Sequence, residues 1–266
     1  MLKICIAGAT GWVGQALSKS LLQKADIQLT AGLSRSYAGR DLSEVLRLDG
    51  PPIPLFGHVT EALDAADFDV LIDFTNPTIA KSNVLAALKK GKRVILGTSG
   101  LSDADFEDIE QVASQKNSSV LAAGNFAITA VLLQRFAEMA ARYIPEYELI
   151  DYAAAGKQDA PSGTVAELAY RLSLVQKPKI EVDIAATIGR KDARGATING
   201  IQVHAVRLPG HVLAVEAIFG AKDEKLLLRH DAGSGADPYI QGILLAIQKI
   251  NTFTGLRRGL DTVMDF

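Results

Sequence analysis

The densest set of residues able to do chemistry lies in positions 148–165, which read ELIDYAAAGKQDAPSGTV. Lys157 supplies a point charge, and Asp159 can orient a neighbouring group. Ser162–Thr164 falls where a loop turns into a helix, and the free backbone N–H groups of a helix start attract anions. The second half of this stretch therefore predicts an anion-binding site beside a lysine.

A second candidate site is a glycine-rich turn near the N-terminus. The short apolar run Leu2–Ala7 is typical of a buried parallel strand, and it is followed by Gly8, Gly11 and Gly14 and then by a helical pattern. A strand before this spacing and a helix after it favour dinucleotide binding, although Ala9 stands where the first glycine of the commonest fingerprint falls. In this interpretation Gly11 lets the backbone approach a pyrophosphate, and Gly14 lets the helix pack on the strand. The alternative is a tight turn without a ligand.

The end of the second predicted strand bears on which nucleotide would bind. Ile27–Leu33 is followed by Ser34, Arg35, Ser36 and Tyr37, with no carboxylate among them. A carboxylate there would bind the ribose 2′-hydroxyl of NAD, whereas Arg35 can pair with a 2′-phosphate and stack on adenine. We therefore expect NADPH in preference to NADH, with NADH possible; the alternative for Arg35 is a solvated surface arginine.

Apolar strands alternate with helical patterns through the first half of the chain, which predicts a doubly wound parallel sheet of the Rossmann-like α/β class. The expected strands are Leu2–Ala7, Ile27–Leu33, Asp69–Thr75, Arg93–Leu96 and Val120–Ala123. Helices are expected from Thr78 to Lys90, and from Asp103 to about Lys116 after the cap Ser102. The proline-rich residues 41–60 are interpreted as a loop or edge segment.

Ligands of such sheets lie outside the carboxyl ends of the strands, where several polar turns of this chain fall together. The expected cofactor-binding residues are Gly8, Ala9, Thr10, Gly11, Trp12, Val13, Gly14, Ser34, Arg35, Phe74, Thr75, Gly97, Thr98, Ser99, Gly124, Asn125 and Phe126.

The second half of the chain predicts a different domain. A helix from about Ile128 to Tyr143, a strand Tyr147–Tyr152 and a helix Thr164–Leu174 precede the strand-rich residues 182–230. We expect an α+β domain whose mixed, open-faced sheet is covered by helices on one side, with the other side left as a bare apolar oligomer interface. The final helix Pro238–Ile250 is expected to return to the first domain. The predicted dinucleotide-binding domain is residues 1–126 and 237–266, and the substrate-binding and oligomerisation domain is 127–236.

The bulk properties exclude several functional classes. The 266 residues carry a formal net charge of −2, which argues against a nucleic-acid partner. No apolar run approaches the roughly 20 residues of a membrane span, and the N-terminus leads directly into a strand rather than a signal peptide. Cys5 is the single cysteine, so no disulfide framework or thiolate metal cluster can form within the chain. We expect a cytoplasmic protein without a metal site.

Taken together, the motifs resemble those of the 4-hydroxy-tetrahydrodipicolinate (dihydrodipicolinate) reductase family over essentially the whole chain. The matching segments are Gly8–Gly14, Asp73–Pro77, Gly97–Gly100, Asn125–Phe126, Lys157–Thr164, Arg194–Gly195, His204–Gly210 and Arg229–Asp231. The resemblance implies reduction of a cyclic imine dicarboxylate by hydride from NAD(P)H, and a tetramer formed through the sheet domain. It also implies that Lys157 is the general acid or its electrostatic partner, and that Ser162, Gly163 and Thr164 hold a substrate carboxylate.

The chain departs from the family pattern at two positions. The family carries consecutive histidines, one a proposed proton donor and the other a substrate ligand, where this chain has Ala153 and Ala154. Neither methyl group can transfer a proton, so we expect a divergent member in which Lys157 is the main protonating group. Tyr152 is an alternative hydroxyl donor or a core or interface residue.

The four histidines elsewhere in the chain are assigned no catalytic role. His204 and His230 match family positions in the sheet domain, where we expect a structural role. His58 and His211 are expected at the surface.

Three functions remain open. The first is the family reaction, and the second is reduction of a different imine or carbonyl acid in a pocket widened by the alanines. The third is a non-catalytic, reductase-like binding protein. Lys157 and the intact anion-binding block argue against the third, because a scaffold needs neither.

Overall fold

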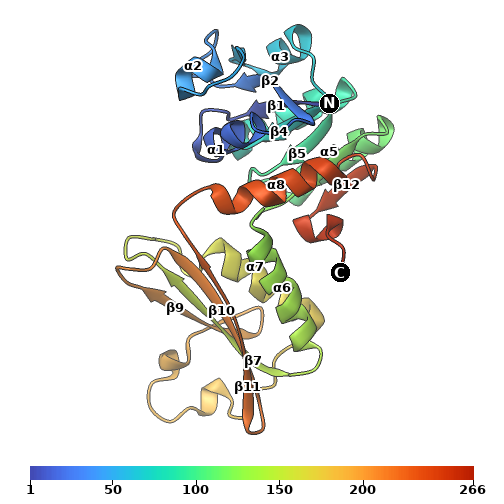
Figure 1. Cartoon of the computed structure of the whole chain (residues 1–266). Helices are drawn as coiled ribbons and strands as arrows, with labels where there is room; N and C mark the ends of the chain where they lie inside the picture. Colours follow the sequence, from blue (N-terminus) through green and yellow to red (C-terminus); the bar gives the residue numbers. More distant parts are fainter. The chain divides into compact units, whose positions relative to one another are not determined.

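The computed structural model describes residues 1–266, which divide into two compact units (Figure 1). The first unit comprises Met1–Ile128 and Ala236–Phe266, and the second comprises Thr129–Gly235. The chain therefore enters the second unit once and returns, and its crossing points differ by no more than two residues from those expected from the sequence.

The first unit is built on a seven-stranded sheet in which every pair of neighbours is parallel. Its strands are β1 Leu2–Ala7, β2 Ile27–Leu33, β3 Leu55–Phe56, β4 Val70–Asp73, β5 Arg93–Leu96, β6 Ser119–Ala122 and β12 Gly255–Arg258. They lie in the order β12-β6-β5-β4-β1-β2-β3. The order reverses direction between β1 and β4, so the crevice expected for a ligand opens at the carboxyl ends of these two strands.

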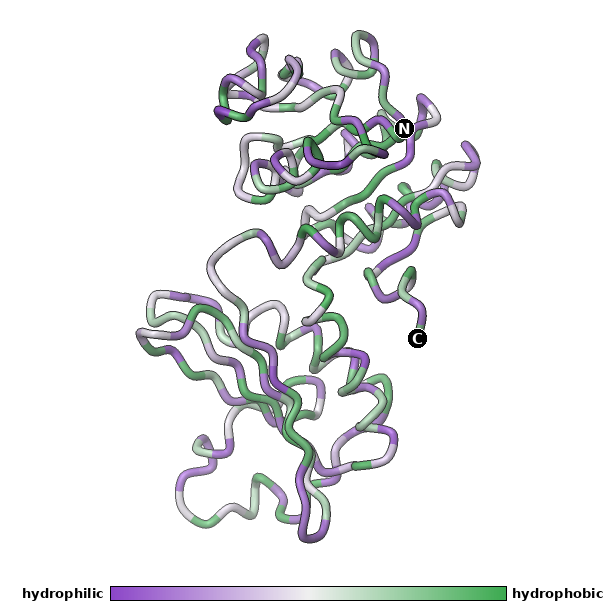
Figure 2. Tube along the Cα trace, viewed as in Figure 1, coloured by the Kyte–Doolittle hydropathy of each residue, from purple (hydrophilic) through white to green (hydrophobic).

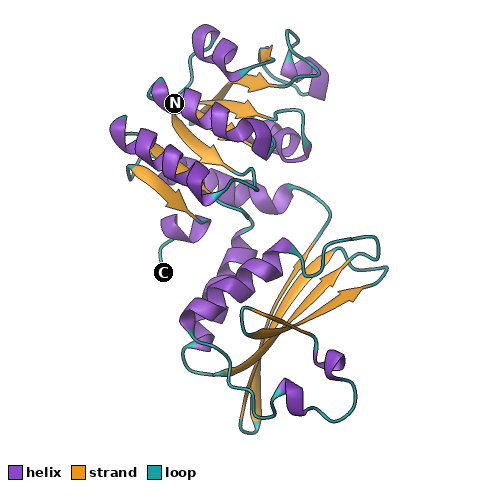
Figure 3. Cartoon of the chain, turned by 180° about the vertical axis from the view of Figure 1, so that it is seen from behind, coloured by secondary structure: helices purple, strands orange, loops and turns teal.

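Helices cover both faces of this sheet (Figure 3). They are α1 Trp12–Leu21, α2 Leu42–Leu46, α3 Val59–Ala65, α4 Pro77–Lys89, α5 Asp103–Gln115 and α8 Asp237–Lys249. Helix α1 packs with α8, whereas α4 packs with both α3 and α5. The doubly wound α/β architecture predicted from the sequence is confirmed.

The sequence interpretation missed several short elements of this unit, namely α2, α3, β12 and a final 3-10 helix. Residues 41–60 are not wholly irregular, because Asp41 accepts a hydrogen bond from the Ser43 N–H at 2.7 Å and starts α2. That helix has five residues, too few to show a hydrophobic period. The strand β12 was also not expected; its four residues pair with β6 and extend the sheet at its edge.

The second unit is a five-stranded mixed sheet covered on one side by two helices, as predicted (Figures 1 and 3). The strands are β7 Glu146–Ala153, β8 Ala196–Ile198, β9 Ile201–Arg207, β10 Leu213–Ala221 and β11 Glu224–Ala232, in the order β11-β10-β7-β9-β8. The helices are α6 Ile128–Ala141 and α7 Gly163–Val175. Two short 3-10 helices, η1 Ile184–Ala186 and η2 Lys191–Arg194, interrupt the region that the sequence indicated as strand-rich, and η3 Leu260–Val263 closes the chain.

Residues of β7 alternate between the two faces of this sheet. Tyr147, Leu149, Asp151 and Ala153 are buried, and the residues between them are half-buried. Tyr147 and Leu149 join α6 and α7 in one hydrophobic core. Figure 2 shows these hydrophobic strands next to the hydrophilic tip of the β10–β11 hairpin.

The sheet face opposite the helices is not simply apolar, which corrects the sequence interpretation. Glu148 on β7 pairs with Arg194 at 2.5 Å and with His204 at 2.7 Å. Arg229 pairs with Glu216 at 3.1 Å. Apolar side chains such as Ile150, Ile218 and Leu227 share this face with the ion pairs. The alternation of residues along each strand predicts which side chains share a face. Which polar residues on neighbouring strands pair with one another depends on the strand register, which the sequence does not show.

None of the helices is long and apolar enough to cross a membrane.

Candidate functional site

The glycine turn after β1 is built by two close approaches of backbone. Gly8 has φ of +81°, and a Cβ added to it would lie 2.4 Å from the Phe74 carbonyl oxygen. A Cβ on Gly14 would lie 2.1 Å from the Gly8 carbonyl oxygen. Only glycine fits at either position, so α1 starts directly against the end of β1.

The start of α1 leaves its first backbone donors without protein partners. Gly11 is the N-cap and has no side chain to accept a hydrogen bond, and the first turn contains no acidic residue. The N–H groups of Trp12, Val13 and Gly14 have no intrahelical acceptor. This helix end combines free donors with the positive pole of the helix dipole, which fits the pyrophosphate of a dinucleotide.

A buried carboxylate fixes the turns that follow β4 and β5. Asp73 Oδ1 accepts from the Thr75 N–H at 3.0 Å, from Thr75 Oγ1 at 2.6 Å and from Thr98 Oγ1 at 2.9 Å. Asp73 Oδ2 accepts from Asn83 at 2.9 Å. Thr75 and Thr98, both expected at the cofactor site, are thus held by Asp73, to which the sequence analysis assigned no role. Cys5 is buried, which confirms it as a core residue, and burial together with the Asp73 charge raises the pKa of its thiol.

A cavity of about 450 Å³ opens beside the glycine turn, within the first unit. It is lined by Gly8, Thr10, Gly11, Leu33, Ser34, Arg35, Ser36, Gly57, His58, Val59, Thr75, Asn76, Ile79, Ser82 and Asn83. Ser34 is nearly buried and shares a hydrogen bond of 2.8 Å with Thr10, so its hydroxyl ties the end of β2 to the glycine turn. Arg35 lines the cavity as expected. His58 is exposed, as predicted, and it also lines this cavity.

The remaining residues expected at the cofactor site differ in exposure. Phe126 is 1% exposed and packs edge-to-face on Phe74, with ring centroids 5.7 Å apart. A Cβ on Gly97 would lie 2.1 Å from the Phe74 ring, so glycine is needed there. Trp12 is exposed and packs edge-to-face on Tyr239. Ala9 is buried, Val13, Gly97 and Asn125 are half-buried, and Ser99 and Gly124 are exposed.

In the second unit, Lys157 follows a tight turn at the end of β7. Its N–H donates to the Ala154 carbonyl at 3.0 Å, and its ammonium pairs with Asp159 Oδ1 at 2.7 Å. The hydrogen bond from Lys157 holds the pKa of the Asp159 carboxyl below its usual value. The Lys157 side chain is one-third exposed, so its charge remains accessible.

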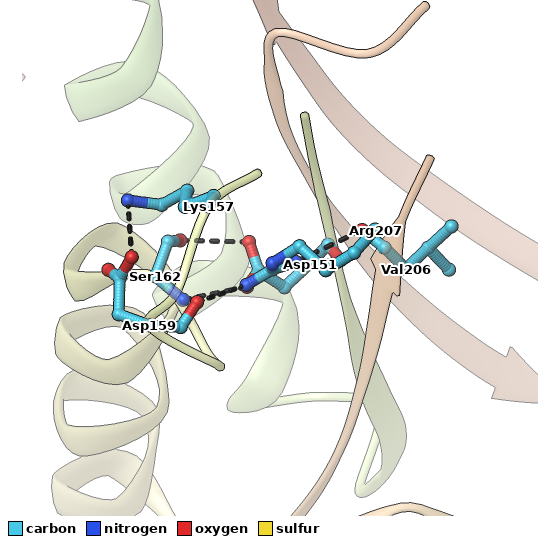
Figure 4. Close-up of polar contacts among 6 residues, drawn as sticks. All are labelled: Asp151, Lys157, Asp159, Ser162, Val206 and Arg207. Atoms are coloured by element: carbon cyan, nitrogen blue, oxygen red, sulfur yellow. Dashed lines mark hydrogen bonds and ion pairs between the residues drawn. The ribbon is translucent and has the colours of Figure 1, made fainter. Parts of the chain in front are cut away.

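The start of α7 is organised by a buried carboxylate (Figure 4). Asp151 Oδ2 accepts from the Ser162 N–H at 2.6 Å, and Asp151 Oδ1 accepts from the Ser162 hydroxyl at 2.8 Å. Arg207 Nη2 donates to Asp151 Oδ2 at 2.6 Å. The sequence analysis assigned a role to Ser162 but none to Asp151 or Arg207; the alternation of buried positions in β7 is the signal that could have marked Asp151.

Two family models together match nearly the whole chain. The model for dihydrodipicolinate reductase, N-terminus, covers residues 2–126, and the model for the C-terminus of the same enzyme covers residues 129–264. The chain belongs to the dihydrodipicolinate reductase family.

Individual relatives of the family support this membership. A 4-hydroxy-tetrahydrodipicolinate reductase from Desulfitobacterium hafniense is 35% identical over 99% of both chains. One from Listeria monocytogenes is 32% identical over 99% of this chain and all of that protein. A dipicolinate-bound dihydrodipicolinate reductase from Paenisporosarcina superposes with a TM-score of 0.87 at 28% identity, covering 99% of this chain and 100% of that one.

More distant structures share the fold alone. Scyllo-inositol dehydrogenase from Lactobacillus casei, solved with NAD(H), has a TM-score of 0.62 at 14% identity and covers 99% of this chain and 93% of its own.

The two alanines at the family's histidine positions lie in different environments. Ala153 ends β7 and has no exposed surface, whereas Ala154 begins the turn to Lys157 and is exposed. The positions are therefore not equivalent, because only a side chain at 154 would reach solvent or a ligand without repacking the interior.

The chain's own histidines occupy other places in the second unit. His204 pairs with Glu148, and His230 is half-buried, where desolvation lowers its pKa. His211 packs against Tyr152 with ring centroids 5.3 Å apart. Arg229 stacks on the same tyrosine at 4.7 Å, so Tyr152 is enclosed by neighbours on the sheet face opposite α6 and α7. His211 is thus half-buried at the surface, where it packs on Tyr152.

All of the expected cofactor-binding residues belong to the first unit, and Lys157, Ser162, Gly163 and Thr164 belong to the second.

Proposed function

We propose that this protein is an NADPH-dependent reductase that converts 4-hydroxy-tetrahydrodipicolinate to tetrahydrodipicolinate in lysine and diaminopimelate biosynthesis. The observation that carries the proposal is the junction of Lys157 with the uncapped start of α7. It offers a cation and free backbone donors within eight residues of chain, as a cyclic dicarboxylate requires. Membership of the family supports the same substrate.

The first unit supplies the features for binding the cofactor. The N–H groups at the start of α1 fit its pyrophosphate, and the cavity beside the glycine turn fits its adenosine end. Arg35 is the candidate for pairing with a 2′-phosphate, which is why we propose NADPH over NADH. The bound cofactor would supply a hydride to the electrophilic carbon of the substrate.

The second unit supplies the features for binding and protonating the substrate. The N–H groups of Gly163 and Thr164 lie in the first turn of α7 and are candidates to hold one carboxylate. Both donors of Ser162 are engaged by Asp151, so we assign Ser162 a positioning role rather than direct binding. Lys157 carries a proton on Nζ beside this site and is the proposed general acid.

The second candidate is a reductase of a different imine or carbonyl acid. It is favoured by Ala153 and Ala154, because a missing substrate ligand would enlarge the site around position 154. Restoring a histidine distinguishes the candidates. Ala154→His should raise turnover of 4-hydroxy-tetrahydrodipicolinate if that compound is the natural substrate. Ala153→His should instead lower stability, because a side chain with no exposed surface would be overpacked.

The central experiment follows the loss of nicotinamide absorbance with NADPH and freshly generated substrate. We expect steady turnover that falls about 10²–10⁴-fold in Lys157→Ala, the usual contribution of a positioned acid, with NADPH affinity unchanged. Lys179→Ala is the matched control, since it removes an exposed lysine of the same unit paired with Glu146. Turnover of another imine alone would establish the second candidate, and NADPH binding without turnover of any imine would indicate a binding protein.

We also propose a cytoplasmic homotetramer assembled through the sheet face opposite α6 and α7. The apolar residues of this face would be buried on association, and the ion pairs between them would fix how two subunits align. Light scattering should give four times the chain mass, and Ile218→Asp should lower it; a monomeric wild type would refute the assembly.

A further inference from the structure

Asp151 is a carboxylate with no exposed surface, on the face of β7 that packs against the helices. Its neighbours across the sheet are Val215 on β10 and Ala205 on β9, neither of which can stabilise a charge. Burying a carboxylate is costly unless several donors compensate for the lost water. The Asp151 carboxylate has three such partners.

Those partners are the Ser162 N–H, the Ser162 hydroxyl and the Arg207 guanidinium, at 2.6, 2.8 and 2.6 Å. Arg207 Nη2 also donates to the Asp159 carbonyl at 2.7 Å, and Nη1 donates to the Val206 carbonyl at 3.0 Å. Figure 4 shows the resulting line from Arg207 through Asp151 to Ser162. One carboxylate thereby holds both the last residue before α7 and, through Arg207, the loop that contains Asp159.

The orientation of the Ser162 side chain has a consequence for α7. A serine at an N-cap normally accepts a hydrogen bond from the second or third N–H group of its helix. Ser162 does not, because its hydroxyl is turned to Asp151. The N–H groups of Gly163, Thr164 and Val165 consequently remain without a protein acceptor.

The same network bears on the charge of the site. An unpaired Asp151 carboxylate next to the start of α7 would repel a dicarboxylate. Arg207 pairs with Asp151 and compensates this negative charge. Arg207 also anchors the backbone of Asp159, whose side chain pairs with Lys157 at 2.7 Å. The N–H donors of α7 and the ammonium of Lys157 are therefore both positioned by the Asp151–Arg207 pair.

We propose that Asp151 and Arg207 are positioning residues for the substrate site: Asp151 draws the Ser162 hydroxyl away from the helix so that its first N–H groups are free for a substrate carboxylate, and Arg207 neutralises Asp151 and fixes the Lys157 loop. The inference rests on the proposed function, since it assigns a cause to the free donors that the function requires.

The test measures dipicolinate binding by calorimetry in the presence of NADPH. Asp151→Asn cannot accept both Ser162 donors and pair with Arg207, so the freed hydroxyl returns to cap α7. Dipicolinate affinity should fall at least about tenfold, the effect of one hydrogen bond to a charged group, while the Kd for NADPH stays unchanged. Glu138→Gln is the matched control: it alters another carboxylate paired with arginine in the same unit, between Arg135 and Arg171, and should leave both affinities unchanged.

A double-mutant cycle separates positioning from a merely structural role. Ser162→Ala removes the hydroxyl that would otherwise cap the helix, so Asp151→Asn should weaken dipicolinate binding much less in that background than in the wild type. A purely structural Asp151 would give the same loss in both backgrounds, which would overturn the proposal.

The proposed role of Arg207 is tested by measuring turnover. Arg207→Lys keeps a positive charge but cannot donate to both Asp151 and the Asp159 carbonyl from one planar group. It should lower kcat about tenfold through the Lys157 loop; a variant with wild-type kcat and KM would refute the role of Arg207. If wild-type protein neither turns over substrate nor binds dipicolinate, the proposed function fails, whereas equal binding by wild type and Asp151→Asn defeats only this inference.

Discussion

Helices α5 and α7 both begin after a serine, yet the two serines do different things. Ser102 caps α5: its hydroxyl accepts from the Asp105 N–H at 3.2 Å, and the Asp105 carboxylate accepts from the Ser102 N–H at 2.9 Å. The Ser162 side chain makes no hydrogen bond to α7, because the hydroxyl, like the Ser162 N–H, donates to Asp151. The residue at the N-cap is the same, and what differs is a buried carboxylate nearby.

Helix α1 reaches the same result as α7 by another route. Its N-cap is Gly11, which has no side chain, so its first N–H groups are left free by composition alone. Helices with free donors are the candidates for anion binding in this protein, whereas α2, α4 and α5 begin with side chains that cap them. The chemistry at a helix start therefore depends on what the N-cap side chain contacts, and its residue type alone does not decide it.

The largest expected effect comes from disturbing the start of α1. In Gly14→Ala the new Cβ would lie 2.1 Å from the Gly8 carbonyl oxygen, so the turn must move and α1 must retreat from β1. We expect NADPH affinity, measured by quenching of protein fluorescence, to fall at least about 100-fold, with a loss of stability in the 1–3 kcal/mol range typical of overpacking. Gly233→Ala is the control, because a Cβ there meets nothing within 4 Å. Unchanged NADPH binding in Gly14→Ala would disprove the close-approach argument.

The next effect tests whether Arg35 acts on the cofactor beside α1 and not on the substrate at α7. Arg35 lines the cavity beside α1 and is remote in sequence from α7. Arg35→Glu should raise the KM for NADPH by about 10–100-fold, the worth of a charge-assisted pair, and leave the KM for NADH and for substrate nearly unchanged. Arg40→Glu, a nearby exposed arginine stacked on Tyr37, is the control. Equal effects on the two cofactors would remove the reason for proposing NADPH.

A smaller effect compares the two serines directly. Ser102→Ala should lower the free energy of unfolding by about 1 kcal/mol, the usual worth of an N-cap, without changing any kinetic constant. Ser162→Ala should lower it by about 1–3 kcal/mol, because Asp151 loses a buried partner. Its substrate KM should change less than threefold, roughly, since the hydroxyl donates to Asp151 and not to substrate. A large rise in KM would restore Ser162 as a direct ligand. Chemical denaturation and initial-rate assays measure the two quantities.

The smallest effect lies outside both helix starts and checks that stability and binding separate. Burial lowers the pKa of His230 from its ordinary value of 6.5, so the unfolded chain binds the proton more readily than the folded chain. The contribution of His230 to the stability of the folded protein is present above about pH 6.5, and it is lost as the pH falls through the lowered pKa of the folded state. Melting temperature should therefore fall on acidification from about pH 7 to about pH 5, and fall less in His230→Gln. An identical pH dependence in the two proteins would contradict this role, and neither affinity should change at pH 7.

Much of this molecule was accessible from the order of its residues. Glycine spacing between an apolar strand and a helical pattern is a local signal, so the turn at residues 8–14 was located without tertiary information. The alternation of strands and helices determined the parallel sheet, and the Lys157–Thr164 block marked both the family and the start of α7. Short elements escaped, because α2 and β12 have too few residues to show a period.

What the tertiary structure decided were the partners of polar groups far apart in the chain. Asp151 and Arg207 are separated by 56 positions and meet only because β7 and β9 pair in parallel. Asp73 and Thr98 likewise meet across β4 and β5, and His58 reaches the Arg35 cavity through the packing of α3. The difference between Ala153 and Ala154 also needed the fold, since burial depends on what covers the sheet. Local propensities fix where a helix begins, but whether its first donors are free depends on a carboxylate that only the assembled sheet brings near.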